Sequence, residues 1–166
     1  MIRAIVYVSN TGFTKKYAEL FSAQTGLPCY PLSENRVKSG EPVIFMGWLS
    51  AGKIKGYAKV LKKYDVKAVA GVGLRNQDST ALEELVRQNN ITGIPAFYLR
   101  GGLDMDRLRG YNKFLLKMFY RVIRKRARKG DPEAASVAET YEKSRDYVSL
   151  DNLKEMLDWY RSVYGQ

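Results

Sequence analysis

The segment that decides the fold is IRAIVYVSNTGFTKKYAELFSAQTG, residues 2–26. Its first part, residues 2–8, is apolar and rich in β-branched side chains, which is typical of a strand buried on both faces. Its last part, residues 14–25, carries apolar side chains at helical spacing, and Gly26 supplies a stop signal. The hydroxyl-rich turn SNTGFT, residues 9–14, therefore lies where a strand ends and a helix begins.

The rest of the chain repeats this alternation. We expect further strands at residues 29–32, 42–47, 67–73 and 94–99, and helices at residues 55–64, 79–89 and 150–164. Strands that alternate with helices predict an α/β fold with a parallel sheet covered on both sides. Right-handed crossovers then favour an open, doubly wound sheet, within a single domain that spans residues 1–166.

Composition excludes several kinds of site. The 166 residues include no histidine and one cysteine, Cys29, so imidazole catalysis, a histidine-ligated metal and an internal disulfide are all excluded. The apolar run at residues 2–8 is too short for a signal peptide or a membrane span, and we expect a cytoplasmic protein. The net charge of +11 favours an anionic partner, whether a phosphorylated ligand, an anionic membrane surface, an acidic protein or nucleic acid.

The turn after the first strand has two interpretations. Ser9 or Asn10 is an ordinary helix cap, or the turn binds a phosphate group at the helix N-terminus. The loop after the first strand of an open parallel sheet lies at the edge where ligands bind, which favours the phosphate. Neither the Walker pattern nor G-x-G-x-x-G is present, so the hydroxyl donors predict a monophosphate rather than a triphosphate or a dinucleotide.

The turn resembles the phosphate loop of flavodoxins, [ST]-x-T-G-x-T, at Ser9, Thr11, Gly12 and Thr14. The resemblance covers most of the chain and implies a flavodoxin-like, five-stranded parallel sheet with the strand order 2-1-3-4-5. It also implies FMN as the cofactor. The phosphate would lie on a loop made of Ser9, Asn10, Thr11, Gly12, Phe13 and Thr14.

In flavodoxins the flavin ring lies between the loops that follow the third and fourth strands. By resemblance, these loops contain Trp48, Leu49, Ser50, Ala51 and Gly52, and then Gly73, Leu74, Arg75, Asn76 and Gln77. Trp48 is suited to stacking on the ring, or it is an aromatic residue that covers the rim of the sheet. Arg75 would place positive charge near the ring, or it is a solvated surface arginine.

The chain departs from ordinary flavodoxins, which are acidic, in its basic charge and in a helical insertion at about residues 100–144. A glycine pair, Gly101 and Gly102, precedes a basic amphipathic helix there, which is similar to the insertion in the flavodoxin-like, quinone-linked protoporphyrinogen oxidases. After it, Asp131 and Pro132 predict the start of another short helix.

The basic helix, residues 111–128, combines a wide apolar arc with a stripe of cations. Its cations recur about every four residues: Lys113, Lys117, Arg121, Lys125 and Arg128. Such a helix suits an anionic membrane interface, although packing on the sheet or on a second subunit explains the apolar arc equally well. Nucleic acid is the least favoured partner, because no nucleic-acid module is recognised.

These features together predict an FMN-binding, flavodoxin-like protein that transfers electrons to or from a redox partner protein or a quinone. One alternative is a peripheral membrane oxidoreductase linked to a quinone. Another is a flavin-free docking or regulatory module on the same fold.

Overall fold

The structure is a computed structural model that describes residues 1–104, 110–132, 134, 138 and 145–165, and only the backbone of residues 110–113, 115 and 116. Its contacts divide the chain into two compact units. The first unit consists of Met1–Gly101 and Tyr147–Gln166, and the second consists of Gly102–Asp146. The second unit overlaps the insertion expected at about residues 100–144, and the expectation of a single domain over residues 1–166 stays a prediction.

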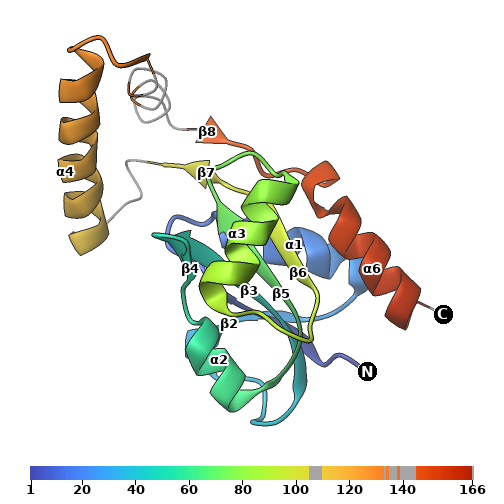
Figure 1. Ribbon diagram of the computed structural model, residues 1–166. Helices are drawn as coiled ribbons and strands as arrows, with labels where there is room; N and C mark the ends of the chain where they lie inside the picture. Colours follow the sequence, from blue (N-terminus) through green and yellow to red (C-terminus); the bar gives the residue numbers. More distant parts are fainter. Residues whose placement is uncertain (105–109, 133, 135–137, 139–144, 166) are drawn as a thin grey trace. The chain divides into compact units, whose positions relative to one another are not determined.

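The first unit is built on a mostly parallel sheet (Figure 1). Its parallel strands are β1 (Ala4–Val8), β2 (Cys29–Pro31), β3 (Pro42–Ser50), β5 (Asp65–Gly73) and β6 (Ala96–Arg100), and their order is β2-β1-β3-β5-β6. A short strand, β4 (Lys53–Ile54), pairs antiparallel with the end of β3. The predicted α/β class with a mostly parallel central sheet is confirmed, and the path follows the expected order once β4 is left out.

Helices cover both faces of this sheet, because alternate side chains of each strand point to opposite faces. On one face, α1 (Phe13–Thr25) and α6 (Lys154–Tyr164) pack on Ile5, Ile44 and Ala70. On the other face, α2 (Tyr57–Lys63) and α3 (Ser79–Asn89) pack on Val6, Phe45 and Val69. Two short 3₁₀ turns, η1 (Leu32–Glu34) and η2 (Asp151–Leu153), complete the connections.

Small residues in β5 allow α3 to lie close to the sheet. A Cβ atom added at Gly71 would come within 2.5 Å of the Leu85 side chain on α3. The N-terminus of α3 is capped by Asp78, whose side chain accepts a hydrogen bond of 2.8 Å from the amide of Ala81. Close packing on one side and a cap at the start together orient α3 along the sheet.

The ends of several elements differ from the predicted ones. β3 continues three residues beyond Gly47, because it forms a hairpin with β4 that sequence periodicity did not indicate. α2 begins only at Tyr57, and the final helix begins as the 3₁₀ turn η2. The predicted helix at residues 79–89 matches α3.

The second unit contains α4 (Gly110–Ala127) and a two-stranded antiparallel pair of β7 (Gly102–Leu103) and β8 (Arg145–Asp146). Asp131 caps a following helical turn as predicted, because its Oδ1 accepts a hydrogen bond of 3.0 Å from the amide of Ala134. Much of the sequence after that turn, and residues 105–109 before α4, lies outside the described residues. Among the helices that are described, none has the length and apolar composition needed to cross a bilayer.

Candidate functional site

The predicted phosphate loop connects β1 to α1. Gly12 occupies the N-cap position with φ 98°, a left-handed conformation that glycine adopts without strain. No side chain caps the helix, so the interpretation of Ser9 or Asn10 as an N-cap is wrong. Instead, the Ser9 hydroxyl accepts a hydrogen bond of 3.2 Å from the amide of Gly12. This bond lies within the turn and stabilises it.

The first turn of α1 has the electrostatic character of an anion site. It contains no acidic residue, and Lys15 and Lys16 are exposed there. The Lys15 ammonium is 3.6 Å from Oε1 of Glu19, and the Lys16 ammonium is 5.6 Å from the centre of the Phe13 ring. The side chain of Thr14 is buried, whereas Ser9 and Thr11 are half-buried. The first amides of an α-helix have no carbonyl partner within the helix and lie at the positive end of its dipole. Backbone amides and neutral hydroxyls therefore meet at one end of one helix.

The loop predicted after β3 is a hairpin instead. Trp48, Leu49 and Ser50 belong to β3, and only Ala51 and Gly52 form the turn into β4. Their φ angles of 48° and 76° are both positive, as a two-residue type I′ turn requires. Trp48 is half-buried at the end of the strand, with the Lys55 ammonium 5.9 Å from the centre of its ring.

Asn89, the last residue of α3, holds this hairpin. Its side-chain Nδ2 donates a hydrogen bond of 2.9 Å to the carbonyl of Gly52, and its Oδ1 accepts one of 2.8 Å from the amide of Ile54. Lys53 also donates to the carbonyl of Gln88. The Trp48–Gly52 segment is therefore fixed to a helix by side-chain contacts, which short-range sequence patterns did not reveal.

The loop after β5 is held by Tyr98 of β6. The amide of Arg75 donates a hydrogen bond of 2.9 Å to the Tyr98 hydroxyl, and a Cβ atom at Gly73 would collide with that hydroxyl. Burial raises the pKa of the Tyr98 phenol, and the hydrogen bond from Arg75 opposes that shift only in part. The Arg75 side chain forms an ion pair with Glu84 on α3, while Leu74 is half-buried and Asn76 is exposed.

Gln77, at the end of the same loop, is bound to the C-terminal segment. Its Nε2 donates a hydrogen bond of 2.9 Å to the carbonyl of Asn152. Its Oε1 is buried and has no hydrogen-bond partner among the described residues. Among those residues, Nε of Arg100 is the one other buried side-chain atom without a partner. A buried polar atom without a partner is uncommon in folded proteins and calls for an explanation.

A polar cluster that sequence reasoning missed lies next to Gln77. The hydroxyl of the buried Tyr17 donates a hydrogen bond of 2.5 Å to the carbonyl of Arg100 and accepts one of 2.8 Å from Nδ2 of Asn152. Asn152 also donates to the carbonyl of Tyr147 at 2.8 Å. The Arg100 guanidinium lies 3.7 Å from the centre of the Tyr147 ring, a cation–π contact.

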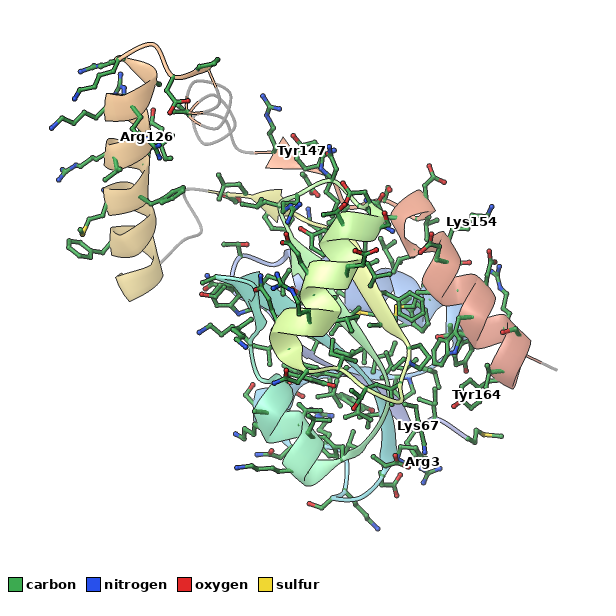
Figure 2. All side chains as sticks on the ribbon, in the orientation of Figure 1. Arg3, Lys67, Arg126, Tyr147, Lys154 and Tyr164 are labelled. Atoms are coloured by element: carbon green, nitrogen blue, oxygen red, sulfur yellow. The ribbon has the colours of Figure 1, made fainter. Side chains whose placement is uncertain are left out.

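These residues come from α1, β6 and the segment before α6, so they share no spacing in the sequence. The one available signal is Arg100, a charged residue at the end of an otherwise apolar strand. Figure 2 labels Tyr147 on the segment that follows β8.

The predicted cationic stripe lies on α4 and on the turn that follows it. Lys117, Arg121, Lys125 and Arg128 are exposed; for Lys113 the structure describes the backbone alone. The described residues contain no group of three or more side chains able to hold a metal ion.

No family model, curated protein or solved structure matches this chain. The resemblance to flavodoxins therefore stays a prediction.

Proposed function

We propose that the first unit is a flavodoxin-like domain that binds FMN non-covalently and transfers electrons. The observation that carries this proposal is the position of residues 9–12. β1 has β2 on one side and β3 on the other, so the strand order reverses at β1. Residues 9–12 connect the end of β1 to the start of α1 at this point. Open parallel sheets bind ligands at such a reversal, outside the carboxyl ends of their strands.

The residues of the loop fit a monophosphate ester. Ser9, Thr11 and Thr14 supply hydroxyl donors, and Phe13 and Thr14 supply backbone amides at a helix N-terminus, whereas the Gly12 amide donates to Ser9. The absence of acidic residues from the first turn of α1 suits a group that carries two negative charges. These residues would hold the phosphate of FMN.

The residues predicted to contact the flavin ring have side chains of a chemical type that suits such a ring. Trp48 is a half-buried aromatic residue at the end of β3, and such a residue suits stacking against a flat ring. Gln77 presents a buried oxygen without a partner, and a flavin ring carries an N–H donor. The role of Arg75 beside the ring stays a prediction, since its guanidinium is paired with Glu84.

Bound FMN would supply transfer of one or two electrons. The protein would bind the phosphate, orient the ring against Trp48 and set the surrounding charge. A redox partner protein would be the source or the acceptor of these electrons.

Titration of the purified protein with FMN, followed by quenching of flavin fluorescence, tests this proposal. Replacing Thr14 by Val keeps the side-chain shape and removes one hydroxyl, and we expect roughly tenfold weaker binding, because a hydrogen bond to a charged group contributes about 1.5 kcal/mol or more. Replacing Thr14 by Ser should restore most of the affinity.

The matched control removes a hydroxyl from the other end of α1. Thr25 donates a hydrogen bond of 2.8 Å to the carbonyl of Phe21, and the Thr25→Val variant should bind FMN as the parent does. If the parent protein binds no FMN, the flavin-free docking module becomes the better description. If Thr14→Val and Thr25→Val weaken binding equally, the phosphate is not held by this loop.

A second candidate is an oxidoreductase that passes electrons to a quinone at a membrane surface. The observation that favours it is the group of exposed apolar side chains on α4, since a lipid-soluble acceptor is reached from a membrane. Reoxidation of the reduced, FMN-loaded protein by a menaquinone analogue in vesicles would support this candidate, and no reoxidation would leave electron transfer to a protein.

A further inference from the structure

The helix α4 exposes large apolar side chains. Phe114, Met118, Phe119 and Val122 are between 47% and 59% exposed, whereas large apolar side chains in the first unit are mostly buried. Three of them, Phe114, Met118 and Val122, follow one another at intervals of four and form one stripe along the helix. We call Phe114, Met118 and Val122 the apolar stripe.

A row of cations runs parallel to the apolar stripe. We call these cations the basic stripe; they are Lys117, Arg121 and Lys125, and all three are exposed. Each of them lies one or three positions away from a residue of the apolar stripe. No ion pair is found for these three among the described residues, whereas Arg126 is 3.5 Å from Asp131. Nitrogen-tipped side chains, including that of the labelled Arg126, project from this helix in Figure 2.

The charge on this segment has one sign. Residues 110–130 contain eight lysine and arginine residues and no aspartate or glutamate. A second copy of the chain would bring two such segments together, and their repulsion would oppose that contact. Nucleic acid would neutralise the basic stripe but would leave the apolar stripe in water.

An anionic lipid surface satisfies both stripes. Apolar side chains of an interfacial helix enter the boundary of the acyl chains, while lysine and arginine side chains reach the phosphates of the headgroups. We infer that α4 lies in the plane of an anionic membrane surface, with the apolar stripe in the lipid and the basic stripe on its headgroups. This inference deepens the second candidate function by naming the residues of α4 that contact the lipid, and it holds whether or not the first unit binds FMN.

Co-sedimentation of the full chain with vesicles tests this inference. The vesicles contain phosphatidylcholine alone or with about a third of phosphatidylglycerol, at low and at high salt. We expect binding to the anionic vesicles only, and at least tenfold weaker binding in molar salt, because exposed charge interactions are screened there.

Three variants separate the contributions. Replacing the basic stripe by Gln, or the apolar stripe by Ser, should each weaken vesicle binding at least tenfold. The control replaces Lys38, Lys59 and Lys62, which are exposed in the first unit, by Gln and removes the same charge. It should bind vesicles like the parent. Circular dichroism melting of each variant checks that the first unit remains folded.

Several results would overturn the inference. One is that the control variant weakens vesicle binding as much as loss of the basic stripe does. Another is that vesicle binding is unchanged when the apolar stripe is replaced. A third is that the protein binds single- or double-stranded DNA more tightly than anionic vesicles. Loss of a dimer in sedimentation equilibrium on removing the apolar stripe would assign that stripe to a subunit contact. The Phe114→Trp variant provides an independent measurement. The fluorescence of the new tryptophan should shift to shorter wavelength on anionic vesicles, and it should not shift if the apolar stripe stays in water.

Discussion

Replacing Tyr17 by Phe removes a single oxygen atom from a fully buried side chain of α1. That oxygen joins three segments, because it donates to the Arg100 carbonyl at the end of β6 and accepts from Asn152 before α6. The ring stays in place, so no large cavity forms. The variant therefore reports on the two hydrogen bonds rather than on core packing.

The expected decrease in the free energy of unfolding depends on which hydrogen bonds Asn152 and Arg100 keep in the variant. Nδ2 of Asn152 keeps its hydrogen bond of 2.8 Å to the Tyr147 carbonyl, whereas the Arg100 carbonyl keeps only a long contact of 3.5 Å to Asn152. Two hydrogen bonds at about 1 kcal/mol each give about 2 kcal/mol lower free energy of unfolding. For a chain of this size that corresponds to a midpoint of thermal unfolding lower by roughly 4–8 °C.

Urea denaturation followed by circular dichroism measures this loss. The control is Tyr30→Phe, since the Tyr30 hydroxyl has no hydrogen bond among the described residues, and its change should stay within about 0.5 kcal/mol. A cycle with Asn152→Ala should show about 1 kcal/mol of coupling to Tyr17→Phe, because the two residues share one bond. A loss below about 0.5 kcal/mol, or strict additivity in the cycle, would refute the account of this cluster.

Two further predictions concern the packing of the first unit. Gly40 and Gly56 both have positive φ, 81° and 88°, but a Cβ atom at Gly56 would come within 2.7 Å of a methyl carbon of Val8, and at Gly40 it would meet nothing within 4 Å. Gly40→Ala should therefore cost about 1 kcal/mol from backbone strain alone and Gly56→Ala should cost more, and equal losses in urea denaturation would contradict the predicted steric contact. Because burial raises the pKa of Tyr98 in the folded state, the unfolded chain loses this proton first as the pH rises above about 10, and the free energy of unfolding should fall there. Tyr98→Phe should reduce that fall in denaturation curves between pH 9 and 11, and an unchanged pH dependence would show that other groups cause it.

The sequence by itself determined the α/β class and the position of the candidate phosphate loop. Residues 2–8 are apolar on both faces apart from Arg3, and residues 14–25 have helical spacing, so a strand and a helix must meet at the turn from Ser9 to Gly12. These signals are local, because each depends on side chains only a few positions apart. For the same reason α3 was predicted at residues 79–89, where the structure has it.

Only the tertiary structure decided how the other edge segments are held. Trp48 lies in a strand rather than a loop because Asn89, far along the chain, binds the hairpin that follows it. Tyr17, Arg100 and Asn152 meet through hydrogen bonds between segments up to 135 positions apart. No periodicity records such a contact, since it depends on how the helices and strands pack together and not on the spacing of residues within any one of them.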